Sequence, residues 1–262
     1  MNILFIGDIV GNPGREAISL FLNELKDEYS IDITIANAEN AAGGKGLTKE
    51  IAEELYAAGI EFITMGNHVW DQRTIMKYID EETRLIRPAN YPIGAPGKGY
   101  GMIRKSGRKV GVINLSGRVY LPPLEDPFSM SIRLVNEIAK ETQIILVDIH
   151  AEATSEKIAL GWFLDGKVTA VLGTHTHVQT ADARLLEQGT AYITDVGMTG
   201  PRDSVLGVKK ELIINRFLTQ MPVKFEIATG PIQINAVMIS VDDRSGKALQ
   251  IVPIQKTAQG KK

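Results

Sequence analysis

The chain has 262 residues, a formal net charge of −2 at pH 7 and no cysteine. Hydrophobic residues make up 44% and charged residues 23%, values typical of a globular protein with a full core. The lack of cysteine excludes disulfide bonds, thiolate metal ligands and cysteine nucleophiles, and it agrees with a reducing cytoplasmic location. The near-neutral charge argues against a polymeric nucleic acid partner, and no apolar stretch is long enough to cross a membrane.

The first third of the chain alternates apolar runs with helical patterns. Apolar runs at residues 3–9, 31–37 and 60–66 predict strands, and amphipathic stretches at 15–28 and 48–59 predict helices between them. Thr48 is expected to cap the second helix and Gly59 to end it. Alternation of this kind predicts βαβ units and a largely parallel sheet.

The remainder of the chain continues this pattern and then changes. Strands are predicted at 109–115, 143–150, 168–173 and within 190–201, the last ending at Asp195, with helices at 129–141 and in the middle of 151–166. From Pro222 onward, alternating apolar residues and glycine turns predict an antiparallel meander, followed by a frayed tail at 258–262. No repeat or linker divides the sequence, so we expect one α/β domain, residues 1–262.

All four histidines of the chain, His68, His150, His175 and His177, follow predicted strands. His175 and His177 are two residues apart, and on an extended backbone such side chains point to the same side. A pair of this kind suits a metal, because imidazole is a common ligand for zinc, iron and copper. Two surface histidines on a polar turn would give the same pattern, so the pair alone leaves both interpretations open.

Other nitrogen and oxygen donors follow the remaining predicted strands. The carboxyl ends of parallel strands gather at one edge of a sheet, which is where ligands bind in such folds. Each donor alone has an ordinary explanation as a cap, a turn residue or a satisfied core residue, but their joint placement favours a metal centre. The candidate ligands are Asp8, Glu39, Asn40, Asn67, His150, His175 and His177. Seven ligands are too many for one tetrahedral ion and suit two ions that share a bridge.

The candidate ligands and one neighbouring histidine suggest a hydrolytic site. Glu39 is the candidate bridge, because a ligand between two cations must be anionic and carry two oxygens. Two cations would lower the pKa of a shared water from ~15.7 toward about 7 and would bind phosphoryl oxygens. His68 is then free to protonate the leaving oxygen as general acid. The alternatives for His68 are a further metal ligand or a partner that orients Asp71.

Several further side chains could contact a substrate. Arginines could bind phosphate and aromatic rings could stack on a base, although solvated arginines and core packing are the more common situations. These candidates are Arg15, Arg87, Arg118, Trp70, Tyr91 and Phe128.

Four short motifs occur in a characteristic order: GD at 7–8, GNH at 66–68, His150, and GTHTH at 173–177. They resemble the ordered motifs of the calcineurin-like metallophosphoesterase superfamily. Longer segments, among them FIGDIVGNPGR, NAENAAGGKGLT, TMGNHVWD, DIHAEATSEK and GTHTHVQTAD, are more similar still to the bacterial YmdB-type group. That group is associated with hydrolysis of 2′,3′-cyclic nucleotides, and the resemblance extends over most of the chain.

The resemblance implies a four-layer αββα sandwich with mixed sheets and a dinuclear centre held by the seven candidate ligands, with His68 as proton donor. Iron is the metal it favours, with manganese or zinc as alternatives, and it also implies a homo-oligomer. Two positions depart from the wider superfamily: Val10 stands where a histidine is usual, and Glu39 replaces the usual bridging aspartate. With one imidazole fewer and the amide oxygen of Asn40 added, one of the two metal sites has a harder set of ligands. Such a site would bind manganese or magnesium more readily.

Residues and resemblance together predict a cytoplasmic dimetal phosphodiesterase. Its expected substrates are small cyclic nucleotides, the 2′,3′-cyclic nucleoside monophosphates, opened by a metal-bridged hydroxide with His68 as general acid. One alternative is a phosphomonoesterase or protein phosphatase with the same dimetal centre. The other is a non-catalytic, metal-dependent regulator that binds a nucleotide.

Overall fold

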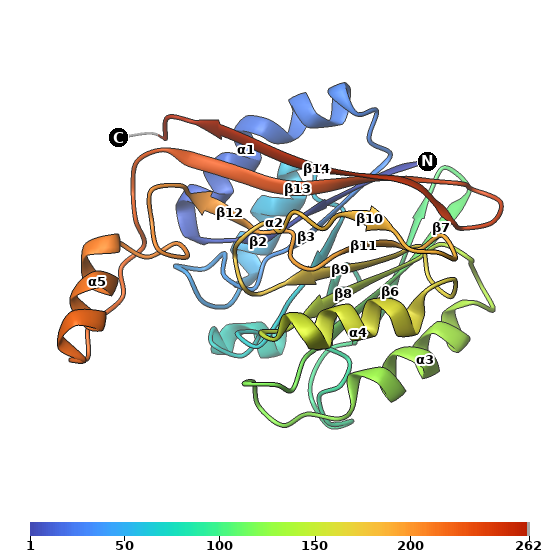
Figure 1. Cartoon of the computed structure of the whole chain (residues 1–262), viewed down its shortest axis with the longest axis horizontal. Coiled ribbons are helices and arrows are strands. Elements are labelled where there is room, and N and C mark those ends of the chain that lie inside the picture. Colours follow the sequence, from blue (N-terminus) through green and yellow to red (C-terminus); the bar gives the residue numbers. More distant parts are fainter. Residues whose placement is uncertain (261–262) are drawn as a thin grey trace.

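A computed structural model describes residues 1–260 and places two β-sheets face to face between two layers of helices (Figure 1). This arrangement confirms the expected four-layer αββα sandwich with mixed sheets. Lys261 and Lys262, at the end of the tail expected to fray, lie outside the described residues. No helix within residues 1–260 has both the length and the apolar character needed to span a bilayer.

The first sheet combines the N-terminal strands with the C-terminal hairpin. In spatial order it contains β2 (Asp8–Ile9), β12 (Met198–Pro201), β13 (Ile232–Val241), β1 (Asn2–Ile6), β3 (Ile33–Asn37), β4 (Phe62–Thr64) and β5 (Leu85–Ile86), with β14 (Ala248–Ala258) paired to β13. Strands β1, β3, β4 and β5 run parallel to one another, as the βαβ pattern predicts. β13 is antiparallel to β1, β12 and β14.

The second sheet is formed by the middle of the chain. Its order is β10 (Arg184–Leu185), β11 (Ala191–Ile193), β9 (Ala170–Thr174), β8 (Ile145–His150), β7 (Arg108–Ser116) and β6 (Tyr100–Lys105). The four inner strands are parallel, and the two edge strands are antiparallel to their neighbours.

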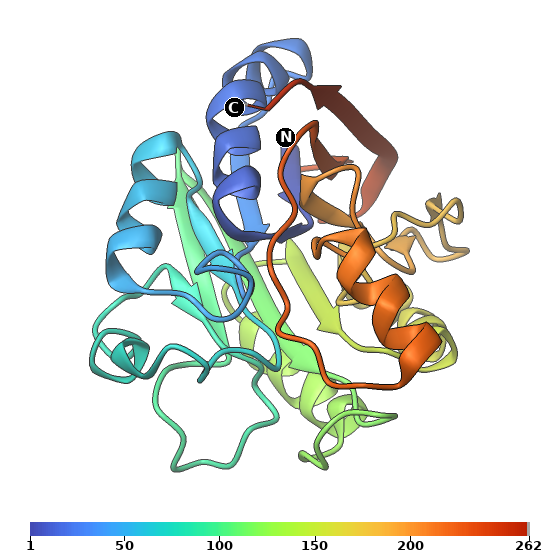
Figure 2. The same cartoon turned by 90° about the vertical axis from the view of Figure 1, so that its left-hand side faces the viewer.

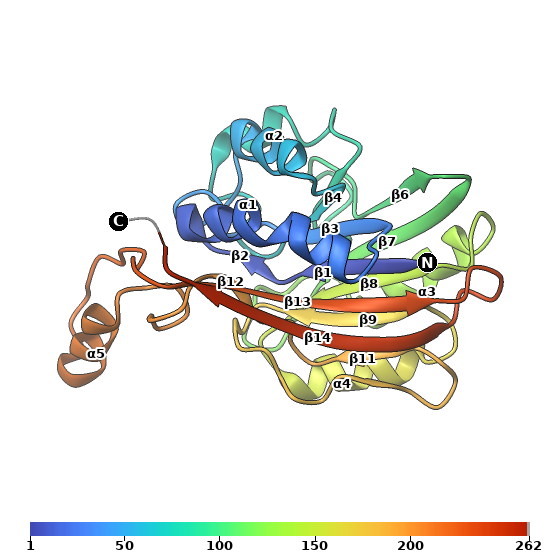
Figure 3. The same cartoon turned by 90° about the horizontal axis from the view of Figure 1, so that it is seen from above.

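Helices α1 to α4 cover the outer faces of the two sheets (Figure 3). α1 (Gly11–Glu28) and α2 (Lys49–Ala58) lie on the first sheet, and α3 (Pro127–Ile138) and α4 (Thr154–Leu164) lie on the second. The predicted limits of α2 are confirmed, since Oγ1 of Thr48 accepts a hydrogen bond from the backbone of Ile51 and Gly59 ends the helix with a φ of 107°. A short 3-10 helix, η1 (Arg73–Lys77), precedes β5.

The sequence of β1 shows how the layers are specified. Alternate side chains of a strand face opposite sides of the sheet. Ile3 and Phe5 therefore enter the core between the two sheets, where Leu146 of β8 meets them, while Leu4 and Ile6 pack toward α1. All four β1 side chains are buried, which explains why this strand is a continuous apolar run.

Three local features differ from the sequence-based expectation. The predicted strand within 190–201 is two strands in different sheets, because the chain leaves β11 at Ile193 and crosses to β12. Residues 223–230 form no strand, since they make only an isolated bridge through Ile227 and have no neighbouring strand to extend it. β6, α5 (Lys210–Thr219) and the short elements η1, β5 and β10 were not predicted. α5 projects away from both sheets and buries none of its residues (Figures 1 and 2).

Candidate metal centre

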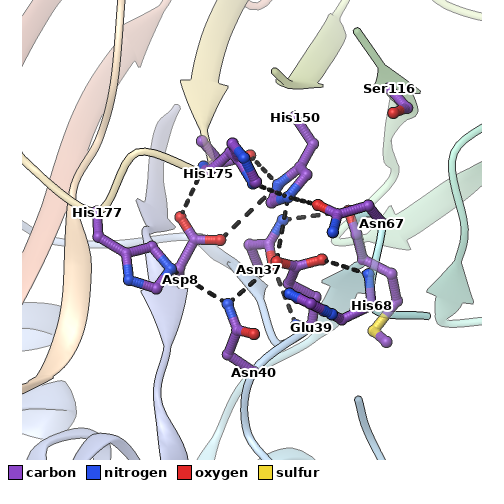
Figure 4. A network of polar contacts seen from close by, with 12 residues as sticks. Asp8, Asn37, Glu39, Asn40, Asn67, His68, Ser116, His150, His175 and His177 are labelled. Atoms are coloured by element: carbon purple, nitrogen blue, oxygen red, sulfur yellow. Dashed lines mark hydrogen bonds and ion pairs between the residues drawn. The ribbon is translucent and has the colours of Figure 1, made fainter. Parts of the chain in front are cut away.

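The candidate ligands come from the carboxyl ends of strands in both sheets, and the structure brings them into one cluster (Figure 4). In the first sheet, Asp8 follows β1, Glu39 and Asn40 follow β3, and Asn67 follows β4. In the second sheet, His150 is the last residue of β8, and His175 and His177 follow β9. Because the parallel strands of both sheets end at the same edge, residues up to 169 positions apart in sequence meet there.

The innermost group is Glu39, His150 and His175, whose nearest donor atoms all lie within 4.8 Å of one another. Nε2 of His150 lies 3.1 Å from Oε1 of Glu39, 3.0 Å from Oδ1 of Asn67 and 3.0 Å from Nδ1 of His175. Glu39 and His150 are fully buried. Four electron-rich atoms from four strand ends therefore converge on one small volume.

Hydrogen bonds on the far side of the imidazoles fix which ring nitrogen faces the centre. Nδ1 of His150 lies 2.9 Å from Oγ1 of Thr174, and that hydroxyl donates to Asp148. The hydroxyl can therefore accept the Nδ1–H proton of His150. Nδ1 of His177 lies 3.1 Å from the carbonyl oxygen of Leu206, which can only accept. Partners of this kind fix the tautomer of metal-binding histidines.

His175 is oriented in the same way by an acidic side chain that sequence reasoning missed. Nε2 of His175 lies 3.2 Å from Oε2 of Glu152, which leaves Nδ1 directed at His150. Glu152 stands two residues after His150, within the segment DIHAEATSEK. An acidic residue so close to a strand-ending histidine was the available signal for this role.

The charges at the centre favour a positive charge there. Burial raises the pKa of Glu39, but the neighbouring His150 outweighs it and holds that pKa at about 2. Burial likewise lowers the pKa of His150, but Glu39 and Asp8 raise it to about 9. Without metal, a proton on His150 therefore supplies the positive charge at neutral pH. Burial, and then repulsion by His150, lowers the pKa of His175 to about 3.

A metal ion fits this donor set better than a proton does. One proton on Nε2 of His150 can be donated to only one of its three close neighbours, whereas a cation can bind lone pairs from all of them. Oδ1 of Asp8 is also buried without any hydrogen-bond partner, which is costly for a carboxylate. Space is reserved as well, since a Cβ added at Gly66 would lie 2.3 Å from Oε2 of Glu39 and 2.4 Å from Nε2 of His150.

A second group of donors lies on the other side of Glu39. The backbone nitrogen of His175 donates to Oδ2 of Asp8 at 3.1 Å, and Nδ2 of Asn40 lies 3.2 Å from Nε2 of His177. Nδ2 of Asn40 also donates to Oε1 of Glu39 at 3.0 Å. As placed, Asn40 turns its amide nitrogen toward the centre, so a 180° rotation of the amide is needed to present its oxygen to a metal.

His68 lies at the solvent side of this cluster. Its Nδ1 is 2.9 Å from Oδ2 of Asp71, and its backbone nitrogen donates to Oε2 of Glu39 at 3.0 Å. The His68 side chain is about a quarter exposed, at 25%. The contact with Asp71 expected from one of the alternatives is present, and it is compatible with either role of His68, as proton donor or as further ligand.

The backbone around His175 and His177 contradicts the expected extended geometry. Both residues lie in the left-handed region, with φ of 98° and 64°. Such values are uncommon for residues with a side chain and cost of order 1–3 kcal/mol each. The two imidazoles reach the cluster from a tight loop, and the reason given by strand periodicity is wrong.

The centre opens into a cavity of about 220 Å³ lined by His68, Glu152, His175, His177 and Leu206, together with Glu39 and Asn40.

The arginines and aromatic residues considered as substrate contacts are engaged elsewhere. The buried guanidinium of Arg87 donates to the carbonyl oxygens of Pro88, Ala95 and Pro96 and fixes the proline-rich loop. The other candidates make internal contacts, Arg15 with Glu54, Arg118 with Asp126, Trp70 with Tyr91, and Phe128 with Phe163.

The chain is similar to proteins from several bacteria. A family model described as YmdB-like protein matches residues 4–254. The chain is 54% identical over 251 residues to a protein of Bacillus subtilis (strain 168) named 2′,3′-cyclic-nucleotide 2′-phosphodiesterase, covering 96% of this chain and 95% of that protein.

Two solved structures share the fold. A hypothetical protein from Thermus thermophilus has 42% identity and a TM-score of 0.92, with 98% of this chain and 99% of that chain covered. A structure described as a novel phosphatase from Mycoplasma pneumoniae has 37% identity and a TM-score of 0.93, with 98% and 93% covered. The family and the enzyme class predicted from the sequence are confirmed by these matches. From its motifs, its fold and its relatives, the chain belongs to the YmdB-like protein family.

Proposed function

We propose that this protein is a dimetal phosphodiesterase that hydrolyses 2′,3′-cyclic nucleoside monophosphates. The observation that carries the proposal is the convergence of nitrogen and oxygen donors around Glu39 and His150, beside a buried Asp8 oxygen that has no hydrogen-bond partner. The substrate class is supported by the name of the Bacillus subtilis relative, 2′,3′-cyclic-nucleotide 2′-phosphodiesterase.

The donors divide into two sets that share Glu39. Asn67, His150 and His175 would hold one ion and Asp8, Asn40 and His177 the other, and the Glu39 carboxylate would be shared between them. When bound, the two ions lower the pKa of a water from ~15.7 toward about 7 and attract the phosphoryl oxygens. The chain's own contribution is to orient each imidazole through Thr174, Glu152 and the Leu206 carbonyl, so that no imidazole must reorient on binding.

His68 serves as the general acid in this proposal. Asp71 holds Nδ1 of the imidazole, which leaves Nε2 to deliver a proton to the ester oxygen that departs from phosphorus. The hydrogen bond from the His68 backbone to Glu39 fixes the imidazole beside the centre. His68 is also partly exposed, so it can regain its proton from solvent after each turnover.

The donor types favour iron, with manganese and zinc as alternatives. The set with His150 and His175 offers two imidazoles. The set with Asp8, Asn40 and His177 offers one imidazole and more oxygen atoms, so this second set accepts harder ions such as manganese.

The cavity of about 220 Å³ favours a small substrate. We also propose that the chain acts as one domain, that it works in the cytoplasm, and that it is a homo-oligomer. The exposed apolar side chains of α5, including Phe217 and Leu218, support the last point.

Steady-state assays with and without chelator test the proposal. The purified protein should hydrolyse 2′,3′-cyclic AMP and bis-p-nitrophenyl phosphate, and chelator should abolish both activities. Turnover of p-nitrophenyl phosphate or a phosphoserine peptide well above that of the cyclic diester would instead support the phosphomonoesterase or protein phosphatase. The regulator would be supported if the wild type is inactive but still binds nucleotide, and if the His68→Ala protein behaves in the same way.

A further inference from the structure

A buried ion pair lies behind the loop that carries His175 and His177. Nζ of Lys157 in α4 is 2.8 Å from Oδ2 of Asp195, which follows β11, and both side chains are fully buried. Charged side chains are almost never fully buried unless they are paired. Even when they are paired, desolvation offsets most of the attraction, so such a pair is weak evidence for a role in stability alone.

The same Asp195 oxygen also holds the residue between the two histidines. Oδ2 of Asp195 accepts hydrogen bonds from the backbone nitrogen of Thr176 at 3.0 Å and from its hydroxyl at 2.6 Å. Thr176 therefore points toward Asp195, while the imidazoles on either side of it are directed to the cluster of donors.

Backbone contacts attach both ends of the loop to the segment around Asp195. Val196 donates to the carbonyl oxygen of Gly173 at 2.8 Å, and Met198 donates to that of His177 at 3.2 Å. Further along, the backbone nitrogen of Asp195 donates to Oγ1 of Thr180 at 2.9 Å. The loop is thus held at its start, its middle and its end by one short piece of chain.

Gly173 makes this close approach possible. A Cβ at this position would lie 1.8 Å from the carbonyl oxygen of Thr194 and 2.9 Å from Cδ of Lys157. With no side chain there, Lys157 can pass behind β9 to reach Asp195. The glycine of the GTHTH motif is therefore explained first by the close approach of the Thr194 backbone and then by the passage of Lys157, rather than by the donors themselves.

The conformation of the loop requires such a restraint. His175 and His177 have φ of 98° and 64°, and residues with side chains keep such values only when the surrounding structure imposes them. We propose that Lys157 and Asp195 are positioning residues, which hold Thr176 so that the loop presents His175 and His177 to metal. This inference rests on the proposed metal-dependent function, and it assigns a role to residues that are not themselves ligands.

Calorimetric titration of metal-free protein with Mn²⁺ tests this role directly. The variant Thr176→Val keeps the branched shape and removes one of the two bonds to Asp195. The double variant Lys157→Met with Asp195→Asn removes both buried charges together, so that neither is left unpaired. We expect Mn²⁺ affinity to fall about 10- to 100-fold in each variant, as when partners that orient metal ligands are lost. The melting temperature of the metal-free Thr176→Val protein should stay near that of the wild type.

Asp165→Asn is the matched control. Asp165 is a buried carboxylate that accepts hydrogen bonds from the backbone nitrogens of Gln188 and Thr190. These contacts lie at the ends of β9 and β11 that are farther from the loop with His175 and His177. Its replacement should lower the melting temperature and leave Mn²⁺ affinity within about twofold of wild type.

The outcomes separate the inference from the function on which it rests. Wild-type affinity in Thr176→Val and in the double variant would overturn the inference, and so would an equal loss in Asp165→Asn. If the double variant does not fold, Thr176→Val decides. A wild-type protein that binds no Mn²⁺, Fe²⁺ or Zn²⁺ would overturn the proposed function itself.

Discussion

Nε2 of His150 lies 3.1 Å from Oε1 of Glu39, although His150 ends a strand of the second sheet and Glu39 follows a strand of the first. This contact joins the two halves of the sandwich at their common edge. Oε1 of Glu39 also accepts a hydrogen bond from Nδ2 of Asn40, so Glu39 contacts members of both sets of candidate ligands.

Replacing Glu39 by glutamine keeps its shape and removes the anion. We expect kcat/KM for 2′,3′-cyclic AMP to fall at least about 100-fold, since bound metal contributes several kcal/mol to transition-state stabilisation. Elemental analysis should show fewer than two metal equivalents per chain. Glu61→Gln is a suitable control, because Glu61 also accepts a backbone hydrogen bond, from Thr34, and lies at the other end of the strands. Full metal content in Glu39→Gln would refute the bridging role.

Replacing His68 should affect proton transfer and leave metal binding intact. We expect His68→Asn to lower kcat on 2′,3′-cyclic AMP by about 10²- to 10⁴-fold, as for other general acids. The loss should be much smaller on bis-p-nitrophenyl phosphate, because p-nitrophenolate leaves without needing a proton. Asp71→Asn should show the same dependence on leaving group with a smaller effect. An equal loss on both substrates, accompanied by lost metal, would mean that His68 is a ligand.

Gly66 leaves room for the centre, and an alanine there should fill that room. A Cβ at Gly66 would lie 2.4 Å from Nε2 of His150, so the donors must move apart. Displacement by about 1 Å can cost roughly 100-fold in rate, and we expect Gly66→Ala to lose at least that much activity. Gly94 has open space around its Cβ position, so Gly94→Ala should match wild type in the same assay. Wild-type kinetics in Gly66→Ala would show that the centre lies elsewhere.

Glu152 orients His175 from a half-exposed position. Without the carboxylate, the imidazole loses the partner that directs Nδ1 toward His150, and we expect Glu152→Gln to weaken Mn²⁺ binding about 10-fold. Isothermal titration of metal-free protein measures this change, with the exposed Glu187→Gln as control. Unchanged binding in Glu152→Gln would leave the Glu152 contact without a role in the site.

The polar residues at strand ends are the part of the site that the sequence predicts well. Asp8, Glu39 and His150 follow largely apolar runs, and parallel topology places the ends of neighbouring strands of one sheet together. The sequence predicts one edge of one sheet, whereas the structure divides these residues between two sheets that share that edge. The path of the loop through His175 and His177 could not be predicted in this way. It depends on Asp195, which reaches Thr176 from another strand, and local periodicity carries no information about that contact.

The unpredicted parts of the fold have a similar cause. Residues 223–230 alternate like a strand, but a strand needs a pairing partner. This segment follows α5, a projecting helix that buries none of its own residues. The partner that fixes the tautomer of His177 is the carbonyl of Leu206, and any residue type could provide it. Contacts made by backbone atoms across long sequence separations leave no signature in residue identity.

Titration of metal-free protein with Mn²⁺, followed by hydrolysis of 2′,3′-cyclic AMP, tests the central claim most directly. The proposed centre predicts no hydrolysis without metal and a rise in rate that reaches its plateau at two equivalents per chain. Full turnover by the chelated, metal-free protein, or a plateau at one equivalent, would contradict it.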